Sequence, residues 1–301
     1  LGYRSFLNIS YLIYGLSIAL LIAVFIFGHV RQGAQRWVTI GSFALQPSEF
    51  CKLSIILTLA HFLSNRDKMH QQIKSLGLCA LIVLLPLLLI LKQPDLGTAI
   101  LFLPIVLTVL FIWGIRWRYL IGMVLTGAAS APFLWFMLKP YQQKRLMVFV
   151  NPSADPLGSG YTALQSKIAV GSGGLLGKGW LQGTQTQLDF VPEHHTDFIF
   201  CVLGEEFGFA GTLLLIAMYW ALISYALHIM ERTTDQRARY LAAGITAMLF
   251  SQAVVNLAMT IGLAPITGIT LPLVSYGGSS LVVTLMAIGF LISIHRERSI
   301  F

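Results

Sequence analysis

Charged residues are scarce in this chain of 301 residues. Asp, Glu, Lys and Arg together account for only 11% of it, whereas hydrophobic residues account for 56%, and the mean hydropathy is +0.77. Soluble domains usually contain about 25% charged residues. The composition therefore excludes an ordinary soluble protein and predicts one that crosses a membrane several times.

Cysteine is also rare. The three cysteines, Cys51, Cys79 and Cys201, lie far apart in three different apolar stretches. Disulfide frameworks and zinc sites depend on cysteines paired with other ligands at short spacing. Neither has support in this sequence, and the cysteines are expected to be packing residues.

What the chain does have is a series of long apolar stretches. A helix needs about 20 residues to cross about 30 Å of hydrocarbon, and lipid requires every backbone polar group to be paired within the protein. The sequence therefore predicts an all-α fold, a polytopic bundle of transmembrane helices that forms one integral membrane domain over residues 1–301. Eight spans are expected, near residues 8–29, 48–64, 75–92, 97–115, 118–138, 197–229, 236–262 and 273–295.

The 20 basic residues outnumber the 12 acidic ones, which gives a formal net charge of +8. They are scattered over short loops and form no single basic stripe, so nucleic acid is not an expected partner. Cytoplasmic loops of membrane proteins are rich in Lys and Arg, and this bias places both termini in the cytoplasm and the long loop at 139–196 outside. The cytoplasmic set is Arg4, Arg66, Lys68, Lys74, Arg116, Arg118, Arg232, Arg237, Arg239, Arg296 and Arg298.

Two charged residues stand inside a predicted span. An ionisable side chain costs about 2.5–3.5 kcal/mol to insert there, so it usually faces a cavity or has a partner. In "LQPSEFCKL", Glu49 and Lys52 are three residues apart on a predicted helix, close enough to pair. A structural ion pair and a functional pair explain this spacing equally well.

Other polar residues border the spans. In "LKQPDLGTA", Pro94 ends one span and Asp95 is placed to cap the next, which is a more common role than catalysis. In "RQGAQRWVTIG", Arg36 and Trp37 form an amphipathic pair. Such a pair suits a lipid interface or an anionic headgroup.

The long loop combines cations with flexible glycines, an arrangement that suits a phosphate-bearing ligand. The run from Ser172 to Lys178 nearly matches a nucleotide P-loop. It has Ser172 in place of the first glycine and Gly179 in place of the final Ser or Thr, and no strand is predicted before it, so ATP binding is rejected. The candidate phosphate ligands are Lys144, Arg145, Lys167 and Lys178.

The segment "FVPEHHTDFIFCVLGEEFGFAG" at 190–211 carries acids into a predicted span. On an ideal helix, four small residues lie within about 40° of Asp197. They are Cys201, Gly204, Gly208 and Gly211. Small residues mark a face of close helix packing, so Asp197 is expected to point into the bundle at the outer membrane edge. A helix-start acid and a catalytic acid explain Asp197 equally well, whereas Glu205 and Glu206 are expected to be packing or network acids.

Several sequence blocks occur together in one order along nearly the whole chain. The longest is "NLAMTIGLAPITGITLPLVSYGGSS" at residues 256–280. The others are "GAQRW", "QPSE", "QPDLGTA", "DPLGSGY", "GSGGLLGKG" and "PEHHTDFIF". In these blocks the chain resembles the SEDS family (shape, elongation, division and sporulation), whose members include RodA, FtsW and SpoVE, and it is more similar to the RodA branch. Members normally have about ten spans, so the resemblance implies that the first two are absent from this chain, which starts with Leu1 rather than Met.

The resemblance implies a peptidoglycan glycosyltransferase that polymerises lipid II on the outer face of the bacterial cytoplasmic (inner) membrane during cell elongation and cell-shape maintenance. It implies that Asp197 is the essential acid, which we expect to be the general base for the acceptor hydroxyl, with inversion at the donor. It further implies supporting roles around the substrate cavity for Trp37, Glu49 and Lys52. Asp95 is a further candidate for such a supporting role. The cations Lys144, Arg145, Lys167 and Lys178 are the candidates for holding pyrophosphate.

The resemblance also implies partners, namely a class B penicillin-binding transpeptidase and elongation proteins such as MreC and MreD. A divalent ion, Mg²⁺ or Mn²⁺, is a candidate helper for the pyrophosphate, but no residue cluster defines a metal site. The main competing hypothesis is a lipid II flippase or other transporter, because a bundle with buried charges also suits a translocation path. A scaffold that only organises partners is a third hypothesis.

Overall fold

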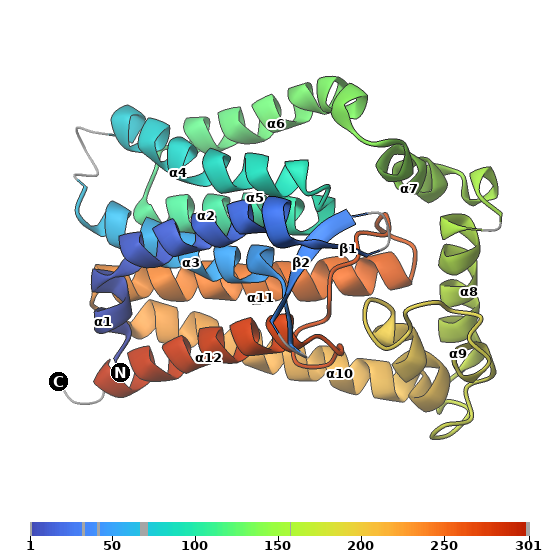
Figure 1. The fold of residues 1–301 in the computed structure, drawn as a ribbon. Helices are drawn as coiled ribbons and strands as arrows, with labels where there is room; N and C mark the ends of the chain where they lie inside the picture. The colour runs from blue at the N-terminus through green and yellow to red at the C-terminus, as the bar shows by residue number, and fades with distance from the viewer. Residues whose placement is uncertain (1, 32–33, 41–42, 67–71, 157, 299–301) are drawn as a thin grey trace. The chain divides into compact units, whose positions relative to one another are not determined.

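The structure is a computed structural model that describes residues 2–31, 34–40, 43–66, 72–156 and 158–298. Lys68, one of the predicted loop cations, lies outside the described residues. Helices form nearly all of the regular structure (Figure 1), which confirms the predicted all-α membrane fold. The α-helices are α1 (Tyr3–Asn8), α2 (Ser10–Phe27), α3 (Pro47–Ser64), α4 (Gln72–Lys92), α5 (Leu96–Trp113), α6 (Trp117–Met137), α7 (Pro140–Val150), α8 (Ser159–Ser172), α9 (Thr184–Gln187), α10 (Ile199–Arg232), α11 (Gln236–Thr260) and α12 (Gly278–Arg298).

Each predicted span corresponds to one long helix. Six of them, α2, α4, α5, α10, α11 and α12, are long and apolar enough to cross a membrane, counted over the described residues. The helices α3 and α6 occupy the other two predicted ranges but are not among these six. The chain is therefore a multi-pass membrane protein.

The chain divides into two compact units. The first contains residues 1–129, 223–249 and 278–301, and the second contains residues 130–222 and 250–277. The helices α6, α10 and α11 contribute residues to both. Each unit has buried residues of its own, with α3 prominent in the first and parts of α10 and α11 in the second.

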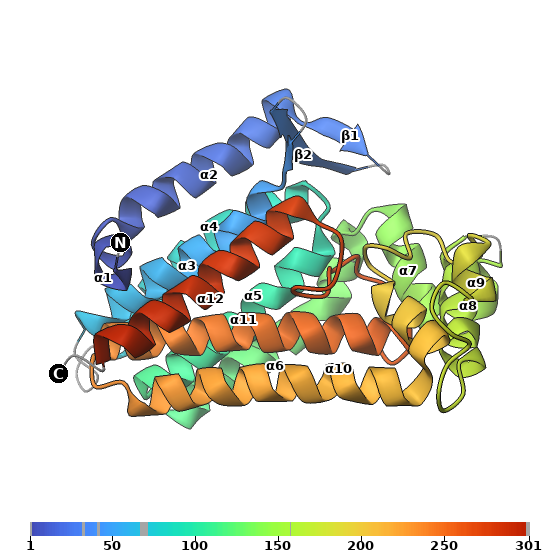
Figure 2. The same ribbon diagram turned by 90° about the horizontal axis from the view of Figure 1, so that it is seen from below.

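In the first unit, α3 is buried almost throughout, with 15 of its 18 residues inaccessible. It contacts α1, α2, α4, α5 and α12, and Figure 2 shows α12 running beside it. Because protein surrounds this helix, it can carry Glu49 and Lys52 without exposing either charge to hydrocarbon. This environment also explains why α3 falls short of the hydropathy of a lipid-facing span.

A small antiparallel sheet follows α2, where the sequence predicted only a loop. Its strands β1 (His29–Arg31), β2 (Ala34–Ile40) and β3 (Phe43–Leu45) pair in chain order, with an irregularity in register between His29 and Val30. Aromatic and β-branched residues in "WVTI" favour extended backbone. Strands β1 and β3 have only three residues each, too few to show an alternation of polar and apolar residues, so the sequence did not predict the sheet.

In the second unit, the predicted loop at 139–196 contains α7, α8 and α9 as well as a short 3-10 turn, η1 (Pro152–Ala154). The end of α8 lies against the start of α10. A Cβ built on Gly204 would be 3.3 Å from Val170, and one on Gly173 would be 1.9 Å from the carbonyl oxygen of Gly204. Cys201 is buried in the same cluster as Ala169. The predicted close packing of this small-residue face is confirmed for Cys201 and Gly204.

The prediction of one continuous helical face from Asp197 to Gly211 is wrong. The helix α10 begins at Ile199, and Gly208 interrupts it with φ 63° and ψ −157°. At this break the amides of Phe209 and Ala210 donate to the carbonyls of residues 174 and 175, at 2.9 and 3.0 Å. An ideal helix wheel cannot anticipate such a break, because the glycine-rich segment that supplies these carbonyls is distant in sequence.

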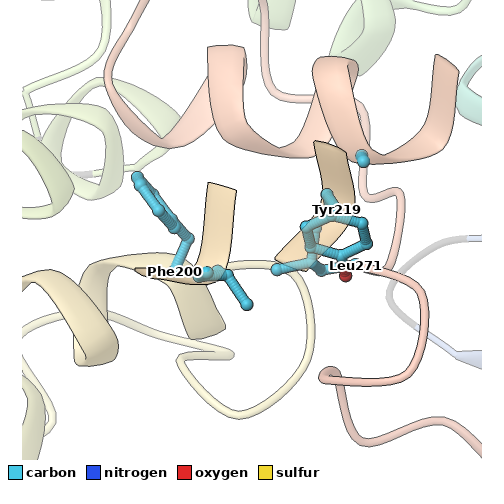
Figure 3. Packing of buried hydrophobic residues seen from close by; sticks show 5 residues of the cluster. Phe200, Tyr219 and Leu271 are labelled. Atoms are coloured by element: carbon cyan, nitrogen blue, oxygen red, sulfur yellow. The ribbon is translucent and has the colours of Figure 1, made fainter. Parts of the chain in front are cut away.

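A hydrophobic cluster attaches the segment after α11 to α10. Phe200, Tyr219 and Leu271 belong to it, and Figure 3 shows their side chains from close by. The Tyr219 hydroxyl donates to the carbonyl of Pro272. This packing positions residues 269–276, an irregular stretch of the long signature block, against the first part of α10.

Glu205 connects α10 to the loop that contains α9. Its side chain is fully buried, and its carboxylate accepts hydrogen bonds from Lys178 Nζ at 2.7 Å and from the backbone amides of Gln185 and Thr186 at 2.9 and 3.0 Å. The Thr186 hydroxyl donates at 2.9 Å. A buried carboxylate with this many donors is a structural anchor, as the sequence predicted for Glu205.

We expect Glu205→Gln to loosen residues 178–187, because an amide loses the ion pair and cannot accept all of these bonds. Loss of a hydrogen bond to a charged group corresponds to about tenfold or more in local opening, so hydrogen exchange of the amides at Gln185 and Thr186 should accelerate accordingly. Mass spectrometry of the purified protein measures this rate. Glu206→Gln is the matched control, since the Glu206 carboxylate accepts only a 3.3 Å bond from the side-chain amide of Gln187 within the described residues. Unchanged exchange in Glu205→Gln contradicts the anchoring role.

Candidate active site

Asp197 lies in the second unit, in the turn just before α10, and it is half-buried. Its backbone carbonyl accepts a 2.8 Å hydrogen bond from the side-chain amide of Asn256, on α11. The same amide donates to the carbonyl of Ile269 at 2.6 Å. Asn256 is fully buried, and it therefore ties the backbone at Asp197 to the segment after α11.

More hydrogen bonds join these two stretches of backbone. The Ser275 hydroxyl donates to the carbonyl of Thr196 at 2.6 Å and accepts from the amide of Leu271 at 2.7 Å. The amide of Tyr276 donates to the carbonyl of His195 at 2.9 Å. Several hydrogen bonds between specific residues therefore hold the turn that carries Asp197 against the signature block.

The side chains of Asp197 and Arg145 both end close to Gly268. It is exposed and has a φ of +73°. A Cβ built there would lie 3.2 Å from Oδ2 of Asp197 and 3.9 Å from Nη1 of Arg145, which projects from α7. The structure therefore places one of the predicted pyrophosphate ligands, Arg145, near the Asp197 carboxylate.

The other three candidate cations have different surroundings. Lys144 pairs with Asp155 at 2.9 Å, and Lys178 pairs with Glu205 at 2.7 Å. The exposed Lys167 lies on α8, and a Cβ on Gly262 would be 1.8 Å from its Cε. Within the described residues Lys167 has no ion pair with an acid, unlike the other two.

The remaining predicted residues belong to the first unit. Lys52 Nζ donates to Glu49 Oε1 at 2.8 Å, and their side chains are 0% and 9% exposed, which confirms the pairing that the spacing predicted. Trp37 is half-buried on β2, next to Arg36. The structure thus divides the predicted site residues between the two units.

Asp95 caps α5, as predicted, and also holds several other side chains. Its carboxylate accepts from the amide and hydroxyl of Thr98 at 3.3 and 2.9 Å, from the Ser48 hydroxyl at 3.1 Å and from the Gln46 amide at 3.2 Å. Arg36 lies 3.6 Å away. The start of α3, the start of α5 and strand β2 therefore meet at this one buried carboxylate.

Asn256, Gly268 and Ser275 were not assigned roles from the sequence, although all three lie in the quoted signature block. A helical Asn gives no signal of its bonding partners, and the need for glycine at 268 depends on a φ that appears only in the folded chain. No group of three or more His, Cys, Asp or Glu residues suited to a metal ion occurs in the described part of the chain. We therefore assign no residue to a divalent ion.

The burial of the Glu49–Lys52 pair predicts that removing one partner lowers the stability of the protein. Lys52→Met leaves the Glu49 carboxylate buried without its partner, which typically costs about 3–5 kcal/mol of unfolding free energy. We expect the double variant Glu49→Gln, Lys52→Met to regain most of this loss, because no charge remains to be buried. Thermal unfolding of the purified proteins tests both. A double variant as unstable as Lys52→Met contradicts the attribution of the loss to an unpaired charge.

A pH dependence follows from Asp155. The hydrogen bond from Lys144, with further bonds from the amide and hydroxyl of Ser159, lowers the pKa of Asp155 below its ordinary value. A carboxyl with a lowered folded-state pKa stabilises the protein above its unfolded pKa of about 3.9, and this contribution is lost as the pH falls through the folded-state pKa. We expect the Tm difference between the wild type and Asp155→Asn to shrink as the pH falls from 6 to 3. A difference independent of pH contradicts this expectation.

Comparison with known proteins agrees with the resemblance seen in the sequence. Residues 1–300 match a family described as cell cycle protein, which comprises FtsW, RodA and SpoVE. The chain is 47% identical to the peptidoglycan glycosyltransferase MrdB of Escherichia coli (strain K12), over 95% of this chain and 77% of that protein. It is 34% identical to the peptidoglycan glycosyltransferase RodA of Treponema pallidum (strain Nichols), over 98% of this chain and 85% of that protein.

Solved structures show the same relationship. A structure concerned with the coordination of polymerization and crosslinking by a peptidoglycan synthase complex has a TM-score of 0.85 and 35% identity, over 99% of this chain and 84% of that one. The rod shape determining protein RodA of Thermus thermophilus has a TM-score of 0.72 and 32% identity, over 99% of this chain and 81% of that one. With matches of this extent in both sequence and fold, the chain belongs to the FtsW, RodA and SpoVE family.

Proposed function

We propose that this chain is a peptidoglycan glycosyltransferase of cell elongation that polymerises lipid II, with Asp197 as the general base. Identity of 47% to a peptidoglycan glycosyltransferase over 95% of the chain supports the activity. The observation that carries the role of Asp197 is its position at Gly268, where its carboxylate and the Arg145 guanidinium border the same exposed point.

The proposed reaction extends a glycan from a polyprenyl pyrophosphate donor. As the acceptor sugar hydroxyl attacks the donor's anomeric carbon from the face opposite the pyrophosphate, its proton passes to the Asp197 carboxylate. The bond from the anomeric carbon to the pyrophosphate oxygen breaks, and the leaving group departs with the electron pair and its developing negative charge. The configuration at the anomeric carbon is thereby inverted.

Cationic side chains are suited to stabilise that departing charge. Lys144 and Lys178 are each held by a carboxylate, at 2.9 and 2.7 Å. We therefore favour Arg145, for its position beside Asp197, and Lys167, an exposed residue that has no ion pair with an acid within the described residues. We propose instead that Lys144 and Lys178 stabilise the loop segments on which they lie, through their ion pairs.

The first-unit residues have supporting roles in this proposal. Asp95 organises the starts of α3 and α5, and Glu49 with Lys52 supplies a buried polar pair on α3. Trp37 suits contact with the lipid-linked substrate, because an indole ring combines apolar area with one hydrogen-bond donor. These residues are proposed to shape the substrate cavity and not to transfer the proton.

The topology and partners belong to the same proposal. The distribution of basic residues supports cytoplasmic termini and a reaction on the outer side of the cytoplasmic membrane. A class B penicillin-binding transpeptidase is the proposed partner, because new glycan must be crosslinked, and the structural relative belongs to a complex that coordinates polymerization with crosslinking. MreC and MreD are proposed as the surrounding elongation proteins.

Lipid II polymerisation by the purified full-length protein tests the role of Asp197. We expect Asp197→Asn to lower glycan yield by about 100-fold or more, because general-base catalysis contributes about 10²–10⁴-fold. Asp189→Asn is the matched control, since it makes the same change at an acid in the same stretch whose side chain is 85% exposed, and it should retain activity. Thermal unfolding confirms that both variants are folded.

The same preparations distinguish the enzyme from a flippase. Reconstituted into vesicles with labelled lipid II, a transporter moves the lipid without lengthening it, whereas a polymerase forms glycan. Near-normal glycan yield from folded Asp197→Asn contradicts the general-base role. Lipid II movement without any glycan from the wild type contradicts the polymerase function itself.

A further inference from the structure

We propose that Gly268 keeps open the space through which the acceptor sugar hydroxyl reaches Asp197. This inference rests on the proposed function, and it adds a residue that determines which groups can approach the base. The position that a side chain on residue 268 would take is, in this proposal, the position of the substrate oxygen.

The geometry at Gly268 supports this role. A Cβ built there has only two atoms of the described residues within 4 Å, apart from its chain neighbours: Asp197 Oδ2 at 3.2 Å and Arg145 Nη1 at 3.9 Å. Both are the charged ends of side chains, and Gly268 itself is exposed. A small polar group placed there meets a proton acceptor on one side and a cation on the other, with access from solvent.

The backbone at Gly268 cannot easily move away to make room for a side chain. The neighbouring residue Ile269 is held through its carbonyl by Asn256, which also holds the carbonyl of Asp197. Leu271 is held through Ser275 to Thr196. Because these bonds link the two segments on which Gly268 and Asp197 lie, they fix the two backbones against each other, and the Asp197 side chain carries the carboxylate from there to Gly268.

The chemistry explains why an empty position is needed. The oxygen that forms the new bond to the anomeric carbon must come within about 2.6–3.2 Å of the base that takes its proton. A methyl group on residue 268 would already stand 3.2 Å from the carboxylate oxygen and would exclude the hydroxyl. Displacement by about 1 Å in such a site costs about 100-fold in rate.

A simpler explanation for the glycine is its backbone conformation, since a φ of +73° is unfavourable for most residues. Asparagine separates the two explanations, because it tolerates the left-handed region much better than alanine while its side chain is larger. If conformation alone requires glycine, Gly268→Asn should perform better than Gly268→Ala. If the position beside Asp197 must stay empty, both variants should be inactive.

Gly174 provides the matched control. Its φ is +57°, and a Cβ built there meets nothing within 4 Å. The variants Gly174→Ala and Gly174→Asn therefore impose a similar backbone demand without filling a confined space. Polymerisation at saturating lipid II and thermal unfolding are measured for all four variants, for the wild type and for Asp197→Asn.

We expect Gly268→Ala and Gly268→Asn to lose about 100-fold or more in turnover while unfolding at temperatures close to those of the corresponding Gly174 variants. The Gly174 variants should keep turnover within about tenfold of the wild type. Substantial activity in Gly268→Asn overturns the proposal. So does failure of Gly268→Asn to fold when Gly174→Asn folds, because an open substrate space accepts a side chain in the absence of substrate. Activity in Asp197→Asn instead overturns the proposed function, whatever the Gly268 variants do.

Discussion

The side-chain amide of one buried residue, Asn256, links two stretches of backbone at the candidate site. It donates to the carbonyls of Asp197 and Ile269, which lie 59 and 13 positions away in the sequence. Both belong to stretches without regular backbone bonding of their own, a turn before α10 and an irregular segment after α11. Burial of an amide donor is costly unless it is bonded, and these two bonds satisfy the side-chain nitrogen of Asn256. Together with the bonds of Ser275 and of the Tyr276 amide, they hold the backbone at Asp197 against the backbone next to Gly268.

Three groups of buried charged side chains follow the same physical rule. Lys52 is paired with Glu49, Asp95 receives donors from three side chains and a helix amide, and Glu205 receives two backbone amides, two hydroxyls and Lys178. In a chain with only 11% charged residues, such groups are kept where protein surrounds them. Charge inside a span thus marks places where helices and loops converge, some of them structural and some at the proposed site.

Local relationships were predictable from the sequence. The pairing of Glu49 with Lys52 follows from a helix with residues three positions apart, and the capping by Asp95 follows from its place after Pro94 at the start of α5. Distant relationships were not predictable. The break at Gly208 is completed by carbonyls of residues 174 and 175, and the three strands after α2 depend on pairing with one another. The helices within residues 139–196 are short and only partly apolar, so that they gave little periodic signal.

The sequence by itself determined that this is a multi-pass helical membrane protein, which residues carry its scarce charge, and which family its blocks resemble. Hydrocarbon thickness and the cost of unpaired backbone impose the first of these on any chain with such long apolar stretches. Only the tertiary structure decided that Asp197 lies before its helix and not within it, that Lys144 and Lys178 are held by acids, and that Arg145 and Gly268 stand beside Asp197. The physical reason is that these positions depend on hydrogen bonds between residues far apart in the chain, and no local pattern records such bonds.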